Sequence, residues 1–250
     1  PKTVLINHDL KLPKNPRILS TFNQSLNQKK YSMQLAIFDL DHTLIPFDSD
    51  KAWNQFLIDI DAVEEEHYRE NNERFYQDYL NADLDIRAYQ RFACEILQTY
   101  PIDQVTAWRD QYVQEIVRPQ LQIKALECIQ SYKIEGFHTL IISATNTFIV
   151  QPIASLHGVD SYLGCEFEVI DGRYTGELVG IPTYQSGKID ALHAWLKTQQ
   201  DSASTIHFYS DSINDRPLLE KADQAFVVDP DQSLAELACH NGWPVIQFAD

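Results

Sequence analysis

The stretch of sequence that decides the fold is Leu35-Ala36-Ile37-Phe38-Asp39-Leu40-Asp41-His42-Thr43. Its first four residues are apolar without a break, and two aspartates follow them closely. A strand that is apolar on both faces is typical of the centre of a parallel sheet, because helices cover both faces there. In open α/β sheets, ligands bind at the carboxyl ends of the strands. The stretch therefore predicts a central parallel strand with a polar site where it ends.

Two further apolar segments, 139–143 and 205–210, repeat this pattern and lead to Ser143 and Asp211. Asp171-Gly172 stands between two alternating segments and indicates a hairpin turn. The remaining segments read as further strands at 225–228 and 244–248 and as helices at 121–132, 148–157 and 188–198. Strands that alternate with helices in this way predict an α/β fold with a doubly wound parallel sheet.

Residues 48–118 have a different composition from the rest of the chain. They contain no glycine and many helix-forming and aromatic residues, with apolar positions at helical spacing. We expect a helical insert over 48–118, which divides the core into 33–47 and 119–250. We also expect its aromatic side chains to pack in a core, rather than to form a stacking surface for nucleotides.

The overall composition excludes several classes of protein. The chain has 250 residues, of which 44% are hydrophobic, and its net charge is −16, which argues against a nucleic-acid partner. No apolar run approaches the roughly 20 residues of a membrane-spanning helix, so we expect no membrane partner. The four cysteines lie far apart in the sequence, which favours buried thiols in a reducing, cytoplasmic compartment over a zinc site or disulfides.

The charge is unevenly distributed along the chain. Residues 1–32 hold six basic residues and one acidic residue, a net charge of +5, whereas residues 33–250 carry a net charge of −21. Residues 1–32 are also rich in Asn, Gln, Lys and Ser, and the single methionine, Met33, directly precedes the first strand pattern. We therefore expect residues 1–32 to form a basic, mostly irregular extension outside the catalytic fold.

The polar residues at the predicted strand ends form a set with its own chemistry. Asp39, Asp41 and Asp211 would meet Ser143 and Lys188 at one edge of the sheet. Close carboxylates repel one another unless a cation neutralises them, and Mg²⁺ binds such oxygen ligands together with a substrate phosphate. A nucleophilic aspartate, a lysine and a metal ion at one site predict phosphoryl transfer.

Four segments in this order resemble the motifs of the haloacid dehalogenase superfamily of phosphohydrolases. They are Asp39-x-Asp41-x-Thr43, Ser143, Lys188 and Asp211-x-x-x-Asp215. The resemblance covers residues 34–250 and implies a Rossmann-like core. An insert placed directly after the first motif resembles the helical cap, of the C1 type, found in the phosphoserine-phosphatase-like subfamily IB.

The resemblance implies how the two aspartates of the first motif act. Asp39 would be the nucleophile that forms an aspartyl-phosphate. Asp41 would be the general acid that protonates the leaving oxygen and then the base that activates water. The dehalogenase branch of the superfamily lacks a carboxylate at the second position, so Asp41 favours phosphate chemistry over carbon–halogen chemistry.

The resemblance also implies the ligands of the metal ion. Asp39, the backbone carbonyl of Asp41 and the side chain of Asp211 would hold Mg²⁺. Asn214 and Asp215 would hold water molecules of the metal or orient the motif lysine.

The substrate contacts follow from the same resemblance. Ser143 and Lys188 would bind the phosphate group. Asp48 stands nine positions after the nucleophile, where phosphoserine phosphatases carry an acid that helps to bind the substrate amine, and Asp50 is a second acid at the start of the insert. Either acid could instead cap a helix. The second motif reads Ser143-Ala144-Thr145, where phosphoserine phosphatases usually have Ser-Gly-Gly.

These observations predict an Mg²⁺-dependent phosphomonoester hydrolase that acts on a small phosphorylated metabolite, such as a phosphoserine-like or histidinol-phosphate-like compound. A phosphotransferase or mutase would share the same residues and differ in the acceptor. A non-catalytic binding protein that kept the fold would turn over no phosphoester. A receiver-type signalling domain also uses acidic strand ends, but it is smaller and has no helical insert of this size. The sequence leaves the oligomeric state open.

Overall fold

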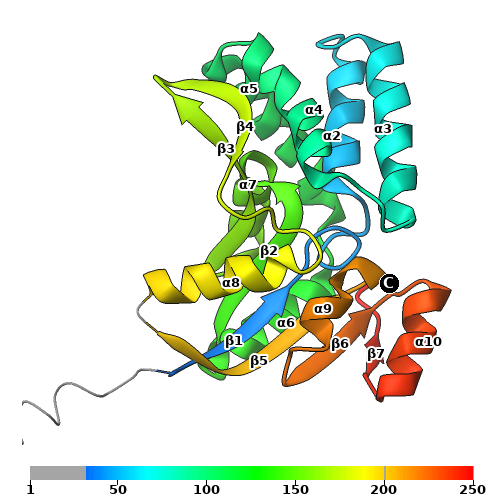
Figure 1. The fold of residues 1–250 in the computed structure, drawn as a ribbon, viewed down its shortest axis with the longest axis vertical. Helices are drawn as coiled ribbons and strands as arrows, with labels where there is room; N and C mark the ends of the chain where they lie inside the picture. The colour runs from blue at the N-terminus through cyan, green and yellow to red at the C-terminus, as the bar shows by residue number, and fades with distance from the viewer. Residues whose placement is uncertain (1–31, 200, 250) are drawn as a thin grey trace, which may run out of the picture.

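The computed structural model describes residues 32–199 and 201–249, so the expected basic extension over 1–32 lies outside the described residues except for Ser32. Seven strands form one sheet in the order β4-β3-β2-β1-β5-β6-β7 (Figure 1). The strands are β1 (Ser32–Phe38), β2 (His138–Asn146), β3 (Ser161–Ile170), β4 (Arg173–Val179), β5 (Ser202–Ser210), β6 (Gln224–Val228) and β7 (Val245–Ile246). All neighbours are parallel except β3 and β4, which form the expected antiparallel hairpin.

Strand β1 lies at the centre of the parallel strands, between β2 and β5. Its last residue, Phe38, is in register with Ile141 of β2 and Tyr209 of β5. The side chains of residues 35–38 are fully buried, as a strand covered on both faces requires. The predicted α/β fold with a doubly wound parallel sheet is confirmed, and the residues that follow these three strands emerge at one edge.

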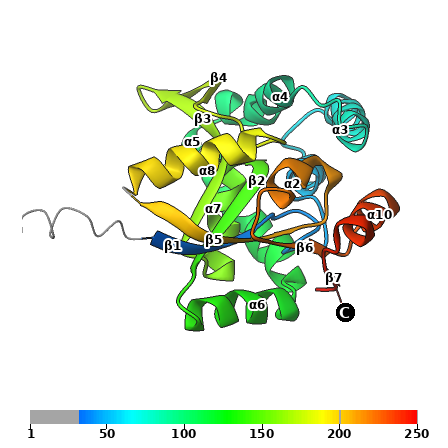
Figure 2. The same ribbon diagram turned by 60° about the horizontal axis from the view of Figure 1, so that its bottom comes forward.

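Helices cover both faces of the sheet, which gives three layers (Figure 2). One face carries α6 (Ile123–Ile134) and α7 (Thr147–His157), and the other carries α8 (Gly187–Thr198), α9 (Arg216–Leu219) and α10 (Gln232–Asn241). Successive side chains of β1 point to opposite faces of the sheet, so Phe38 packs against the helices of the first face and Ile37 against those of the second. None of the helices in the described ranges is both long and apolar enough to span a membrane.

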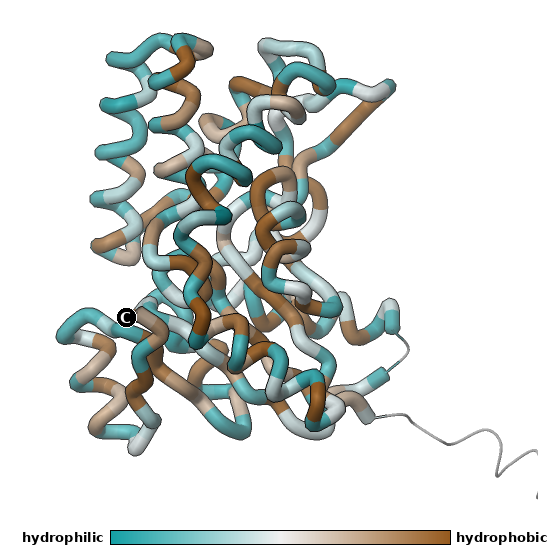
Figure 3. Tube along the Cα trace, turned by 180° about the vertical axis from the view of Figure 1, so that it is seen from behind, coloured by the Kyte–Doolittle hydropathy of each residue, from teal (hydrophilic) through white to brown (hydrophobic). Residues whose placement is uncertain are grey.

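A group of helices connects β1 to β2 and lies above the carboxyl edge of the sheet in Figure 1. It consists of α2 (Ser49–Asp59), α3 (Glu65–Leu80), α4 (Ile86–Thr99), α5 (Ile102–Tyr112), a π-helical turn at Val113–Val117 and a 3-10 turn at Arg118–Gln120. We call α2–α5 the helical insert. Buried aromatic rings hold it together, with Trp53 stacked on Phe56 and edge-on to Tyr112. Helix α3 is mostly hydrophilic (Figure 3), and only Tyr68 and Phe75 of its residues are buried.

Two segments near the carboxyl end differ from the sequence expectation. The predicted strand over 244–248 is paired only at Val245–Ile246. No helix is predicted from the sequence over residues 232–241, whereas the structure has α10 there. Its signals are local, since the Asp231 side chain caps the first turn by accepting from the Leu234 amide and Gly242 ends the helix in a left-handed conformation.

Candidate active site

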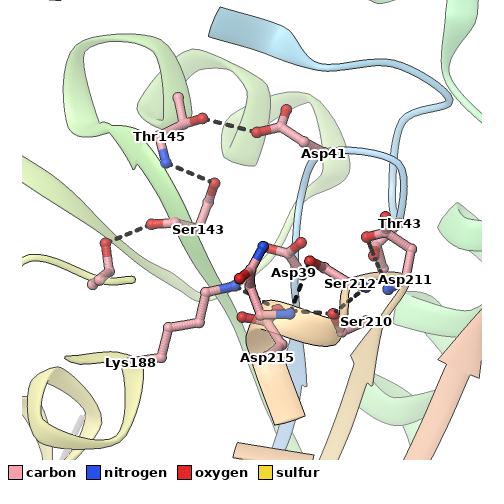
Figure 4. A network of polar contacts seen from close by, with 12 residues as sticks. Asp39, Asp41, Thr43, Ser143, Thr145, Lys188, Ser210, Asp211, Ser212 and Asp215 are labelled. Carbon is pink, nitrogen blue, oxygen red and sulfur yellow. Dashed lines mark hydrogen bonds and ion pairs between the residues drawn. The ribbon is translucent and has the colours of Figure 1, made fainter. Parts of the chain in front are cut away.

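The predicted site residues converge at the carboxyl edge of the sheet, as Figure 4 shows. Asp39 directly follows β1 and Asp211 directly follows β5, while Ser143 belongs to β2. The Asp39 amide donates to the carbonyl of Tyr209 at 2.9 Å, which continues the ladder between β1 and β5. Lys188 lies in the first turn of α8 and reaches the strand ends from one face of the sheet. The topology thus places four separate motifs in one site.

Lys188 makes two short ion pairs at the bottom of the site. Its Nζ lies 2.7 Å from Asp39 Oδ1 and 2.6 Å from Asp215 Oδ2. The Ser210 hydroxyl donates to the same Asp215 oxygen at 2.8 Å. Lys188, Asp39 and Asp215 are only 2–5% exposed. Because buried charges are costly without partners, each member of this triad depends on the others.

Negative charge exceeds positive charge at this end of the site. Burial raises the pKa of Asp39 well above its usual range, and Asp215 and Asp211 raise it further against the opposing effect of Lys188. Burial raises the pKa of Asp211 to about 7, although the hydrogen bond from Thr43 opposes this. Burial alone would lower the pKa of Lys188, but Asp215 and Asp39 outweigh it, so the pKa rises and the amine stays protonated. The site therefore favours a further positive charge.

Thr43 joins the first motif to the fourth. Its hydroxyl donates to Asp211 Oδ1 at 2.9 Å and accepts from the Asp211 amide at 3.0 Å. Thr43 is fully buried. The pair of hydrogen bonds fixes the Asp211 carboxylate relative to the loop that carries Asp39, which explains why a hydroxyl residue occupies this position.

Asp41 points away from the lysine, toward the helical insert and the second motif (Figure 4). Asp41 Oδ1 accepts from the backbone amide of Ser49 at 2.8 Å, and Oδ2 accepts from the Thr145 hydroxyl at 2.8 Å. Two donors from separate segments therefore hold the two oxygens of the Asp41 side chain. Ser143 is fully buried beside them, and its hydroxyl accepts from the Thr145 amide at 3.1 Å.

The two residues predicted to support the metal or the lysine behave differently. Asp215 contacts Lys188 directly, as described above. Asn214 instead accepts from the Tyr184 hydroxyl at 3.1 Å and donates to the carbonyl of Tyr79, at the end of α3, at 3.1 Å. In this structure Asn214 therefore connects the core to the helical insert.

The two acids predicted as substrate contacts lie at the start of α2. Asp48 Oδ1 caps the helix by accepting from the Lys51 amide at 2.8 Å, and Asp48 also lines the cavity, so the cap does not exclude a substrate contact. Burial, followed by the charge of Asp41, raises the pKa of Asp48 to about 6. Asp50 is 3% exposed and accepts from the Asn146 amide group at 3.1 Å. Burial raises the pKa of Asp50 well above its usual range.

A cavity of about 410 Å³ lies between the strand ends and the helical insert. Its core side is formed by the catalytic candidates, namely Asp39, Asp41, Ser143, Lys188, Asp211, Asn214 and Asp215. Its insert side is formed by acidic, aromatic and apolar side chains, namely Asp48, Asp50, Asn72, Phe75, Tyr76, Tyr79, Leu84, Ile86 and Tyr89. The cavity has the size and the polarity of a site for a small phosphorylated molecule.

Comparison with known proteins places this arrangement in a family. The sequence pattern of haloacid dehalogenase-like hydrolases matches residues 36–220. The chain belongs to this family. A histidinol-phosphatase from Neisseria meningitidis is 40% identical to it over 219 residues, which are 86% of this chain and 98% of that protein. A probable phosphatase from Mycobacterium tuberculosis is 31% identical over 86% of this chain and 75% of its own length.

Solved structures agree with the assignment to the haloacid dehalogenase-like hydrolases. A protein of unknown function from Bordetella pertussis superposes with a TM-score of 0.82 at 32% identity, over 87% of this chain and 100% of that chain. A phosphoserine phosphatase in the form of a phospho-aspartyl intermediate analogue has a TM-score of 0.61 at 19% identity, over 87% and 94% of the two chains, which shows the shared fold. The predicted family, Rossmann-like fold and phosphatase class of enzyme are confirmed.

The sequence expectation for the aromatic residues of the insert of this hydrolase was only partly right. Trp53 and Phe56 pack in the interior as expected, but Tyr76, Tyr79 and Tyr89 line the cavity. The Tyr79 hydroxyl lies 2.8 Å from Ser212 Oγ in the loop of the fourth motif. Spacing along a helix shows which residues share a face, but it does not show whether that face meets a core or a cavity.

A divalent cation fits the donor set of this hydrolase. Across residues 32–199 and 201–249, no three His, Cys, Asp or Glu side chains are grouped as a ready-made metal site. Mg²⁺, however, needs only one or two protein carboxylates, because it keeps several waters and takes oxygens from the substrate phosphate. Asp39 and Asp211 offer such carboxylates. Within the described ranges, Lys188 is the one cation that forms ion pairs at this site, with Asp39 and Asp215. The negative charge of Asp39, Asp211 and Asp215 together is therefore incompletely balanced.

Proposed function

We propose that the protein is a Mg²⁺-dependent phosphomonoesterase that acts on a small phosphorylated metabolite through an aspartyl-phosphate on Asp39. The observation that carries this proposal is the buried triad of Lys188, Asp39 and Asp215 at the wall of the cavity. The lysine holds one Asp39 oxygen and offers its remaining donor capacity to a phosphate. The other Asp39 oxygen takes no hydrogen bond from the neighbours that surround it in the described ranges, so it is available as a nucleophile.

The reaction would proceed in two displacements at phosphorus. In the first, an Asp39 oxygen attacks phosphorus, and the bond to the leaving oxygen breaks as Asp41 gives that oxygen its proton. In the second, Asp41 takes a proton from water, and the water oxygen attacks phosphorus. The bond between phosphorus and Asp39 then breaks, which releases inorganic phosphate and restores the Asp39 carboxylate.

The metal would be held by the side chains of Asp39 and Asp211 and by the backbone carbonyl of Asp41. When bound, Mg²⁺ would balance the carboxylates and stabilise the charge that develops on the phosphoryl oxygens. Lys188 and Ser143 would bind the phosphate from the opposite side. Asp215 would keep Lys188 protonated and in place through its 2.6 Å ion pair.

For the leaving group, we propose a small alcohol that carries a positive charge. Asp48 and Asp50 place two carboxylates on the insert side of the cavity, against one cation, Lys51, whose ammonium lies over the Tyr76 ring at 3.9 Å, and Tyr89 adds an aromatic ring. Acids attract a cationic amine, and aromatic rings suit a cation or a flat ring. The relative named histidinol-phosphatase makes an amino alcohol phosphate with an imidazole ring our first candidate, and phosphoserine is the second.

We propose that residues 48–118 act as a cap that closes the cavity. Several polar contacts connect the insert to the core beside the site, among them Tyr79 to Ser212 at 2.8 Å, Gln90 to the Ala144 carbonyl at 3.0 Å, and Gln185 to the Ala82 carbonyl at 3.3 Å. Each joins a catalytic segment to a helix of the insert or to the turn that follows it. Opening of the cap would break them, and closure would exclude bulk water from the phosphate.

We also propose that the enzyme acts in the cytoplasm. Its four cysteines are free thiols, and Cys94 and Cys165 are buried. Burial raises the pKa of each of these two thiols to about 11, so both stay unreactive in the protonated form. Unreactive, unpaired thiols are typical of proteins from a reducing compartment.

The test is phosphate release from a panel of phosphomonoesters, with Mg²⁺ and with a chelator. The panel should include histidinol phosphate, phosphoserine and p-nitrophenyl phosphate, and Asp39→Asn is the control variant. We expect Mg²⁺-dependent turnover of at least one alkyl phosphate and none by the variant. Turnover that survives in Asp39→Asn, or transfer to an added alcohol that exceeds transfer to water, would contradict the hydrolase proposal.

A further inference from the structure

Thr145 occupies a position that the assigned roles leave without a task. It follows the phosphate-binding candidate Ser143 by two residues, lines the cavity and is only 4% exposed. Its side chain and its backbone face different parts of the site. The hydroxyl donates to Asp41 Oδ2 at 2.8 Å, and the amide donates to Ser143 Oγ at 3.1 Å (Figure 4).

The Asp41 carboxylate is held by two donors from two separate segments. One is the backbone amide of Ser49, at the start of α2, and the other is the Thr145 hydroxyl from β2. Each donor occupies a different carboxylate oxygen, so together they fix the rotation of the group. The Ser49 contact alone would leave the carboxylate free to turn about its own axis. Thr145 is therefore the side chain that sets where the second oxygen points.

The Asp50 carboxylate interacts with the Thr145 side chain and is a second possible acceptor for its hydroxyl hydrogen. A hydroxyl can donate only one hydrogen bond at a time. Asn146 supplies Asp50 with a donor of its own at 3.1 Å, which frees the Thr145 hydrogen for Asp41. The short 2.8 Å contact to Asp41 agrees with this arrangement.

We infer that Thr145 is a positioning residue for Asp41: its hydroxyl orients the carboxyl group, which in its protonated form delivers a proton to the leaving oxygen and takes one from water in the second step. The backbone amide of the same residue orients Ser143 at the phosphate. Thr145 thus sets the acid–base group and the phosphate-binding group relative to each other. Proton transfer needs hydrogen-bond geometry, so a misdirected carboxylate would slow the step even if its charge stayed the same.

This inference rests on the proposed function, and its test uses leaving groups of two kinds. An alkyl phosphate needs a proton on its leaving oxygen, whereas p-nitrophenyl phosphate leaves as a stable anion and needs little help. The constant kcat/KM reports the steps up to the first irreversible one, which is phosphorylation of Asp39. We therefore compare kcat/KM for the best alkyl substrate and for p-nitrophenyl phosphate in Thr145→Val and Thr145→Ser, with thermal unfolding as a check on folding.

For Thr145→Val, which keeps the shape and removes the hydroxyl, we expect kcat/KM for the alkyl substrate to fall by about 10- to 100-fold. We expect kcat/KM for p-nitrophenyl phosphate to fall by less than about threefold. Thr145→Ser should retain most of the alkyl activity, because it retains the donor. In an Asp41→Asn background, Thr145→Val should add little further loss, since both changes act through one group.

Equal losses for the two leaving groups in Thr145→Val would overturn the inference, because they would indicate a role in phosphate binding or in folding. Unchanged alkyl activity in Thr145→Val, or no rescue by Thr145→Ser, would also overturn it. Should the natural protein itself hydrolyse neither substrate, the proposed function fails, and that outcome is distinct from the previous ones. If Thr145→Val does not fold, Thr145→Ala replaces it as the variant without the hydroxyl. The inference then requires Thr145→Ala, but not Thr145→Ser, to lose more kcat/KM for the alkyl substrate than for p-nitrophenyl phosphate.

Discussion

The core side and the insert side of the cavity are built in different ways. On the core side, Lys188, Asp39 and Asp215 are 2–5% exposed and are joined by ion pairs of 2.6 and 2.7 Å. On the insert side, Tyr76, Tyr79 and Tyr89 are only partly buried, and Tyr79 reaches the core through a neutral contact to Ser212. The core side is suited to hold a charged phosphate in one geometry, and the insert side is suited to adjust to a leaving group.

The difference follows from the elements that carry each side. Asp39 and Asp211 continue strands that are paired on both edges within the sheet, so their backbones cannot shift without breaking ladder hydrogen bonds. The insert shares a hydrophobic cluster with α6 and α7, but on its cavity side it meets the strand ends through side-chain contacts such as that of Tyr79 with Ser212. We therefore expect substitutions on the core side to abolish the chemistry and substitutions on the insert side to change the preference among substrates.

The largest effect is expected for Asp39→Asn. It removes the proposed nucleophile, and we expect kcat to fall by at least about 10³-fold for every substrate. Steady-state phosphate release measures it. Asp59→Asn is the matched control, because Asp59 is an exposed acid on α2 that accepts from Gln55 at 2.6 Å, and it should leave kcat unchanged. A loss confined to some substrates would break the proposed contrast between the two sides.

A smaller and selective effect is expected for Asp48→Asn. Asparagine can still cap α2, but it cannot form an ion pair with a substrate amine. A charge-assisted hydrogen bond contributes about 1.5–3 kcal/mol, so kcat/KM for a cationic substrate should fall by about 10- to 100-fold. The value for p-nitrophenyl phosphate, which has no cation, should change little. If both substrates lose equally, Asp48 supports the structure rather than the selection of substrate.

The pKa of Asp48 gives this selectivity a pH dependence. Burial, together with the charge of Asp41, raises that pKa to about 6. The group is a charged carboxylate above this pH and a neutral acid below it, so attraction for a cationic substrate is lost as the pH falls through about 6. We measure the ratio of kcat/KM for the cationic substrate to that for p-nitrophenyl phosphate in the natural protein and in Asp48→Asn, since titration of the substrates is the same for both proteins. As the pH falls through about 6, the ratio should fall further in the natural protein than in Asp48→Asn.

The smallest effect is expected for Tyr79→Phe. The substitution keeps the ring in the cavity wall and removes the contact to Ser212. A neutral hydrogen bond contributes about 1 kcal/mol, so kcat/KM should fall by no more than about fivefold. A loss as large as that of Asp39→Asn would show that the insert takes part in the chemistry, and the contrast drawn above would fail.

The sequence predicts one side of the cavity much better than the other. Asp39 and Asp211 are marked by the apolar strands before them, and parallel pairing brings such strand ends together whatever the details of packing. Ser143 and Lys188 are marked by their order relative to these strands. The partners of Thr43 and Asp41, in contrast, depend on loop geometry that spacing does not encode.

The insert side depends on how helices pack. Tyr79 shares a helix with the buried Tyr68, and nothing local in the sequence separates a residue that faces a core from one that faces a cavity. Asn214 lines the cavity with the other residues of the fourth motif, but its bond to the end of α3 is not foreshadowed by the motif. Such contacts form only after the insert has docked on the core, so they could not be read in advance.

The central claim is that Asp39 receives the phosphoryl group, and trapping it tests this most directly. Asp41→Asn is mixed with p-nitrophenyl phosphate and Mg²⁺, quenched with acid, and analysed by intact and peptide mass spectrometry. This variant lacks the base for hydrolysis, while the aryl leaving group needs no acid, so phosphoenzyme should accumulate. We predict a mass increase of one phosphoryl group on the peptide that contains Asp39, absent in Asp39→Asn. No added mass, or a phosphoryl group on another residue, would contradict the account.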